Sequence, residues 1–119
     1  MNIQIHEFAE GPIAELNSDQ VLINTAEDGT DLVGNMYFQG LDKVILHQKN
    51  ISPAFFELQN GLAGEVLQKF TNYRIRLVIV GQFTHLESRS LRDFILESNQ
   101  GNQVNFVSSL QDAISRLRD

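Results

Sequence analysis

Hydrophobic and polar residues alternate in two short stretches at the start of the chain. Ile3 and Ile5 alternate with polar residues within the segment 2–8, and a second alternation covers 13–17. Between them lies Glu10-Gly11-Pro12, which has the composition of a turn. Because alternation with a period of two is typical of β-strands, the pattern predicts an N-terminal β-hairpin.

Four later segments carry hydrophobic residues at helical spacing instead. The apolar positions are Leu32, Val33, Met36 and Tyr37 in the first segment; Leu58, Leu62, Val66 and Phe70 in the second; Leu91, Phe94 and Ile95 in the third; and Leu110, Ala113, Ile114 and Leu117 in the last. Ser52-Pro53 predicts a short helical turn ahead of the second helix, which is expected to end near Tyr73.

Polar and glycine residues predict where these helices begin and end. Thr25 with Asp28, and Ser109 with Asp112, have the spacing of capping boxes, and Ser88 can cap the third helix. Gly40 and Gly101 stand where left-handed residues commonly end a helix.

Three compact apolar runs separate the helices: 44–46, 75–80 and 104–107. Such runs are typical of strands that are buried on both faces, and strands alternating with helices favour parallel pairing with right-handed crossovers. The sequence therefore predicts a single α/β domain over 1–119. It should contain a mixed, mostly parallel sheet of about five strands, an N-terminal hairpin and about four helices.

The composition narrows the possible chemistry. The 119 residues are 42% hydrophobic, which suffices for a core, and the formal net charge is −6. The lack of cysteine excludes disulfides, thiol nucleophiles and thiolate zinc sites. Since the nine Lys and Arg residues are scattered, we expect no nucleic-acid partner.

Neither a membrane-spanning segment nor a secretory signal is expected. The longest apolar stretch, 77–81, is far shorter than the roughly 20 residues that cross a bilayer. The N-terminal residues include no basic region followed by an apolar core. The sequence therefore predicts a cytoplasmic protein without a membrane partner, and leaves the oligomeric state open.

Polar residues follow each predicted parallel strand, where ligands of open α/β sheets gather. They are His47, Gln48 and Asn50; Gln82, Thr84 and His85; and Ser108 and Ser109. No Asp or Glu stands directly at a strand end, which disfavours acid-base or metal-assisted catalysis. We therefore assign no catalytic residue, metal or cofactor.

Two groups of rim residues nevertheless deserve a structural test. His47, His85 and Glu57 are the only plausible proton carriers there, although their spacing matches no metal signature. Asn60-Gly61 stands at a helix start, where free backbone N–H groups could donate hydrogen bonds to an anion or a phosphoryl group. The alternative is that Asn60 caps its own helix.

Several motifs resemble a bacterial family known only as domain of unknown function 4180. They cover nearly the whole chain: 51–56, 61–65, 67–70, 72–74, 80–81, 90–95, 97–99 and 106–107. The resemblance implies no assigned activity. A more distant similarity is to STAS domains, the fold of anti-sigma factor antagonists, which have the same order of elements.

The STAS resemblance bears on one motif. In STAS domains a helix begins with Asp-Ser-Ser-Gly-Leu, and a partner kinase phosphorylates the serine before the glycine. Here Gly61-Leu62 matches Gly-Leu, but Asn60, Gln59 and Leu58 replace the two serines and the aspartate. Because an amide cannot accept the phosphoryl group, phosphorylation at Asn60 is excluded.

The sequence thus leaves two functional hypotheses. The favoured one is a non-enzymatic, STAS-like regulatory or binding module. It would recognise a partner protein or a small anionic ligand near Asn60 and Gly61, with Gln82 and Ser108 as further binding residues. The alternative is a small enzyme that uses His47, His85 and Glu57 at the sheet rim.

Overall fold

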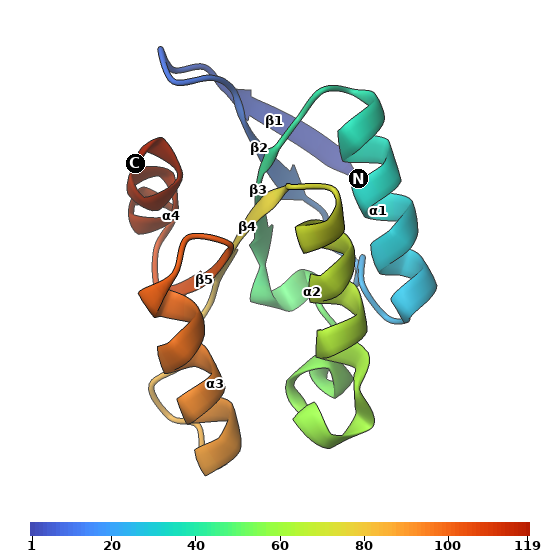
Figure 1. Cartoon of the computed structure of the whole chain (residues 1–119), viewed down its shortest axis with the longest axis vertical. Helices are drawn as coiled ribbons and strands as arrows, with labels where there is room; N and C mark the ends of the chain where they lie inside the picture. Colours follow the sequence, from blue (N-terminus) through green and yellow to red (C-terminus); the bar gives the residue numbers. More distant parts are fainter.

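The computed structural model describes residues 1–119 and contains one five-stranded sheet with helices on both faces (Figure 1). The strands are β1 (Asn2–His6), β2 (Ile13–Asn17), β3 (Lys43–His47), β4 (Arg76–Val80) and β5 (Val104–Val107). The helices are α1 (Ala26–Phe38), α2 (Leu62–Asn72), α3 (Arg89–Gln100) and α4 (Leu110–Arg118). The predicted hairpin and alternating helices and strands are confirmed.

The strands lie in the sheet in the order of the sequence, β1-β2-β3-β4-β5. β1 and β2 pair antiparallel, and all other neighbours pair parallel. The mixed, mostly parallel sheet is thus as predicted. The strand order, which the sequence left open, makes β1 and β5 the two edges.

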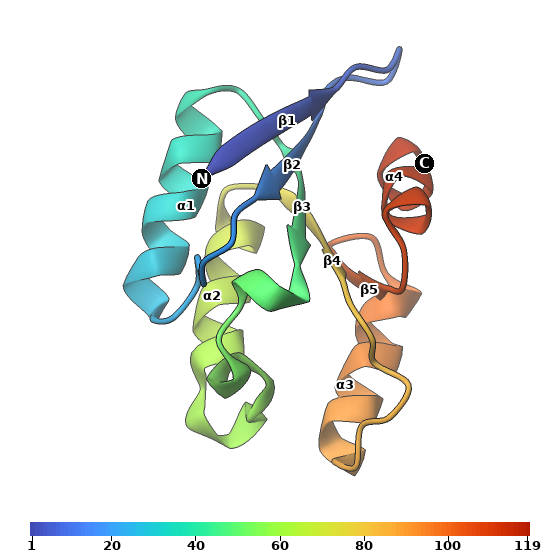
Figure 2. The same ribbon diagram turned by 180° about the vertical axis from the view of Figure 1, so that it is seen from behind.

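Helices cover the two faces of the sheet unequally (Figures 1 and 2). The larger core joins α1 and α2 to one face, and includes Val33, Val66 and Phe70 from the helices. Phe94 and Ile95 of α3 pack against the same core. A smaller cluster of five buried residues lies under α4 on the opposite face and consists of Ile13, Ile45, Val78, Ala113 and Leu117.

Three of the five predicted helix-end signals form as expected. Ser88 caps α3, since its Oγ accepts from the Leu91 amide at 3.2 Å. Thr25 and Asp28 make a full capping box, and Gly40 adopts a left-handed φ of 73° after α1. Gly101 does end α3, but the prediction of a left-handed stop is wrong, since its φ is −103°. At α4 only half of the capping box exists: Ser109 accepts from the Asp112 amide, without a return bond.

The segment between β3 and α2 forms three short 3-10 turns: Gln48–Asn50, Pro53–Phe56 and Leu58–Asn60. Asn50, expected in a polar turn, is fully buried. Its Nδ2 donates to the backbone oxygens of Ser18 and Gln20, at 2.8 Å each. This side chain therefore fixes the segment that follows β3 to the segment that follows β2.

The helices are all short. α1, the longest of them, has 13 residues. None of them combines the length and the hydrophobicity that crossing a membrane requires.

Candidate functional site

The carboxyl ends of β3, β4 and β5 and the segments that follow them form one rim of the molecule. The N-terminal ends of α1, α2 and α3 lie at this same end of the fold (Figure 1). This follows from the topology, because each helix runs antiparallel to the strands it connects. The rim therefore holds the residues that the sequence singled out.

Asn60 is exposed and makes two hydrogen bonds at the start of α2. Its Nδ2 donates to the Ala54 carbonyl at 2.7 Å, and its Oδ1 accepts from the Leu62 amide at 2.9 Å. The second bond satisfies one of the free N–H groups of the helix start. Asn60 thus caps one amide of α2 from the position before the N-cap residue Gly61, and it also ties the start of α2 to the 3-10 turn Pro53–Phe56.

Gly61 links the last 3-10 turn to α2 in a left-handed conformation. Its φ is 80° and its ψ is −3°. No atom lies within 4 Å of the position that a Cβ would take, so the backbone conformation, and not the available space, favours glycine here. The sharp reversal leaves Asn60 and Gly61 at the surface.

A pocket of about 430 Å³ lies next to this helix start, between the 3-10 turns and the start of α3. We call it the Phe56 pocket; it is lined by Phe56, Glu57, Leu58, Gln59, Ser88 and Ser90. A second pocket of about 360 Å³ shares Phe56 and includes the apolar residues Val21, Ile51 and Leu86. Phe56 therefore separates two adjacent depressions of the rim.

Gln82 and Ser108 lie on the rim after β4 and β5. The amide of Gln82 donates to Oε1 of Gln48 at 2.9 Å. Ser108 lines a third pocket, of about 640 Å³, beside β5. The four predicted binding residues thus do not gather in one site. Asn60 and Gly61 lie next to the Phe56 pocket, Ser108 lines the pocket along β5, and Gln82 lines neither of these pockets.

The three predicted proton carriers do not form a site together. His47 is bonded to Glu15, Glu57 lines the Phe56 pocket, and His85 is exposed in the loop before α3. No hydrogen bond or ion pair joins any two of His47, His85 and Glu57. The physical reason is that the β3 pleat directs His47 to the α4 face of the sheet, beside Ile45 of the small cluster.

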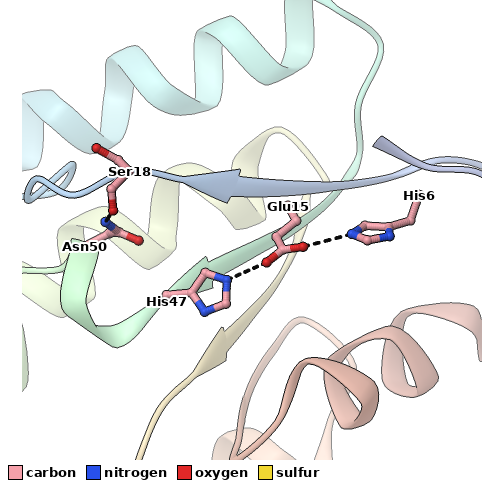
Figure 3. A network of polar contacts seen from close by, with 5 residues as sticks. All are labelled: His6, Glu15, Ser18, His47 and Asn50. Atoms are coloured by element: carbon pink, nitrogen blue, oxygen red, sulfur yellow. Dashed lines mark hydrogen bonds and ion pairs between the residues drawn. The ribbon is translucent and has the colours of Figure 1, made fainter. Parts of the chain in front are cut away.

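His47 instead belongs to a cluster that the sequence did not indicate (Figure 3). The carboxylate of Glu15 lies between two imidazoles: Oε1 is 2.9 Å from Nε2 of His6, and Oε2 is 2.7 Å from Nε2 of His47. The cluster joins β1, β2 and β3 on the α4 face. Glu15 is only 5% exposed, whereas both imidazoles are partly exposed.

The two imidazoles determine the charge state of Glu15. Burial raises the pKa of this carboxyl, but hydrogen bonds from His6 and His47, with the attraction between the charges, outweigh burial and lower its pKa below 4.5. Glu15 is therefore a carboxylate at neutral pH. With each oxygen bonded to a histidine, it orients the two rings but has little capacity left as a proton acceptor.

The arrangement of His6, Glu15 and His47 does not match that of a metal site. No group of three or more His, Asp or Glu side chains is arranged to hold a metal ion. The amino-acid sequence contains only a weak signal for this cluster. Glu15 lies on the same face of β2 as Ile13, but the residues that Glu15 contacts depend on the register of the strands. Hairpin register pairs Gln4 with Glu15, and so places His6 diagonally opposite Glu15.

Comparison with protein families identifies the chain. It belongs to the family described as a domain of unknown function, DUF4180, which matches residues 9–117. The resemblance inferred from the sequence motifs is thereby confirmed. The search of curated proteins found no match.

Among solved structures, the chain is similar to a protein of Thermotoga maritima described as a candidate anti-sigma factor antagonist. The match covers 98% of this chain and 95% of that chain, with a TM-score of 0.54 and 14% sequence identity. At this identity the likeness concerns the fold alone. The STAS-like fold expected from the order of elements is confirmed.

Proposed function

We propose that this protein is a regulatory binding module that contacts a partner protein through the rim around Asn60 and Gly61. The structural neighbour described as a candidate anti-sigma factor antagonist supports a regulatory role, because its description names another protein, an anti-sigma factor, as its target. The fold by itself does not carry function, so the proposal depends on the surface of this chain.

The observation that carries the proposal is the Phe56 pocket beside the Asn60 cap. Phe56 and Leu58 are partly buried and line the pocket together with polar Gln59, Ser88 and Ser90. An apolar floor with a polar border is typical of surfaces that receive a side chain of a partner. The two bonds of Asn60 hold the adjoining backbone in place, which lowers the entropy cost of binding.

The same surface favours a protein over a small anion. Glu57 contributes a carboxylate to the pocket, and the Leu62 amide at the helix start already donates to Asn60. Both features weaken the attraction for an anion. Gln82 and Ser108 would then belong to the periphery of the partner's contact area.

A pull-down from cells that encode the protein tests this proposal. We expect the unmodified chain to retain a partner and Asn60→Asp to lose it, because the change removes the Nδ2 donor and adds a charge at the contact. The matched control is Asn102→Asp, which adds the same charge at an exposed position before β5, at the opposite end of the strands. Equal retention by both variants would contradict the proposal.

A further inference from the structure

β5 is an edge strand, and its outer side faces no other strand. The carbonyls of Gln103 and Val107 accept from the amides of Leu77 in β4 and of Gly81, the residue that follows β4, at 3.0 and 2.9 Å. Because backbone groups alternate in direction along a strand, the N–H and C=O of Phe106 point away from β4. An outer edge of this kind can accept an additional strand.

The side chain of Asn99, from α3, occupies this outer edge. Its Nδ2 donates to the Phe106 carbonyl at 3.0 Å, and its Oδ1 accepts from the Phe106 amide at 2.7 Å. These are the two hydrogen bonds that one residue of an antiparallel neighbouring strand would make. The carboxamide of Asn99 thus takes the place of the backbone N–H and C=O of one residue of a neighbouring strand.

A pocket of about 640 Å³ lies along the same edge, between α3 and α4. We call it the β5 pocket. Its apolar lining consists of Phe83, Ile95, Phe106 and Val107. A strand edge with a pocket between it and a helix is the arrangement that binds extended peptides by strand addition.

The charges around the β5 pocket are acidic. Asp112 and Asp119 line it, and neither side chain is in an ion pair. Arg116 also lines it and offsets one of these two negative charges, while its guanidinium donates to the carbonyls of Asn99 and Gly101. The charge that remains is negative and therefore favours a basic ligand.

We propose that the β5 pocket binds an extended segment of a partner protein in which hydrophobic and basic residues alternate. The segment adds to the edge of β5, and its backbone replaces the carboxamide of Asn99 on Phe106. Hydrophobic side chains then face Phe83 and Ile95, and basic ones face Asp112. The β5 pocket shares no lining residue with the Phe56 pocket, and Ser108 of the β5 pocket is only peripheral to the contact proposed above, so the two proposals are tested by separate experiments.

Replacing the carboxamide of Asn99 by the backbone of the segment leaves the number of hydrogen bonds to Phe106 unchanged. The segment supplies Phe106 with one donor and one acceptor in place of those of Asn99, and the released carboxamide is solvated at the surface. The gain then comes from apolar area covered in the pocket and from the charge attraction. Until a segment binds, Asn99 keeps the edge from pairing with other chains.

The test uses the full-length chain labelled with 15N and a capped hexapeptide of alternating lysine and valine. We expect the peptide to shift the amide signals of 104–108 in NMR spectra. The same peptide with N-methylated valines keeps its charge but loses backbone donors, and should bind at least about tenfold more weakly. A hexapeptide of alternating glutamate and valine should show no binding.

Two variants examine the roles of Asn99 and Asp112. Asn99→Ala should bind the lysine-valine peptide about tenfold more tightly, because no side chain competes for Phe106. Asp112→Asn should bind it a few-fold more weakly at low salt. Should Asn99→Ala fail to fold, Asn99→Asp, which lacks the Nδ2 donor, replaces it.

Several results would overturn the proposal. They are equal binding of the N-methylated peptide, peptide shifts confined to residues outside the β5 pocket, or no binding by either the unmodified chain or the Asn99 variant. Dimerisation of the Asn99 variant in sedimentation, with no displacement by the peptide, would show instead that this edge receives a second copy of the chain.

Discussion

Oε2 of Glu15 lies 2.7 Å from Nε2 of His47, although the two residues are 32 positions apart in the chain. The contact crosses from β2 to the neighbouring parallel strand, and the other carboxylate oxygen reaches His6 in β1. One buried carboxylate therefore connects the N-terminal hairpin to the parallel part of the sheet.

Replacing the carboxylate should weaken the fold. Glu15→Gln removes the charge and presents an amide group to one of the two imidazoles, so we expect a loss of about 1–3 kcal/mol in the free energy of unfolding. Urea denaturation measures this loss. Glu7→Gln, at an exposed glutamate of the same hairpin, is the control and should change stability little.

The pH dependence of stability should reveal the same carboxylate. The pKa of Glu15 is lower in the folded protein than its ordinary value of 4.5. The contribution of Glu15 to stability is therefore fully present above pH 4.5 and is lost as the pH falls through the lowered pKa. Urea midpoints from neutral to acidic pH should therefore fall more steeply for the unmodified chain than for Glu15→Gln. If the urea midpoints of the two chains changed in parallel with pH, the lowered pKa of Glu15 would be contradicted.

The two glycines at the start of α2 should respond in opposite ways to alanine. Gly61→Ala forces a side chain into a left-handed backbone and should cost about 1–2 kcal/mol. Gly64 is exposed within α2 with no atom near its Cβ position, so Gly64→Ala should stabilise by about 0.5–1 kcal/mol. Thermal or urea unfolding of the pair measures both effects, and changes of the same sign would contradict the helix-start geometry.

Substitution of Asn50 should destabilise the fold more than substitution of most other polar residues. Asn50→Ala leaves the carbonyls of Ser18 and Gln20 without this donor and empties a buried site, and should cost roughly 2–3 kcal/mol. Asn50→Asp should cost more, because a carboxylate would face two carbonyl oxygens in a buried place. Asn102→Ala, at an exposed asparagine, should be nearly neutral in the same urea experiment.

Gly81 should tolerate no side chain. A Cβ there would lie 2.6 Å from Cβ of Gln48 and 2.9 Å from Cζ of Phe83. Gly81→Ala should therefore displace Gln48, break its bond to the Gln82 amide and cost about 1–3 kcal/mol. Gly34→Ala is the control, since it adds the same methyl group to open space in α1. Equal stability of the two variants would contradict the close packing of Gly81 against Gln48 and Phe83.

Short-range patterns predicted most of the fold. Thr25 and Asp28 are three positions apart, so their capping box depends only on local geometry, and it forms as expected. Gly101 failed as a left-handed stop because tertiary contacts hold the end of α3: its carbonyl accepts from Asn105 of β5, and its backbone stays at negative φ.

The candidate sites were predicted less well, because they depend on contacts between distant segments. Asn60 could be placed at a helix start from sequence alone. Glu15 could not be assigned to His47, since that contact requires the register of β2 on β3. Asn99 is similar: nothing near it in sequence indicates that it bonds to Phe106 at the edge of the sheet.

The sequential order of the strands has a consequence for how the chain is made. Each new parallel strand pairs with the strand synthesised before it, so no strand must be inserted between two that already exist. The sheet can thus grow outward from the hairpin during translation. The last helix, α4, differs from the strands because it contacts a segment that is made much earlier. Arg118 of α4 bonds to Glu10 in the first turn, 108 positions earlier in the chain.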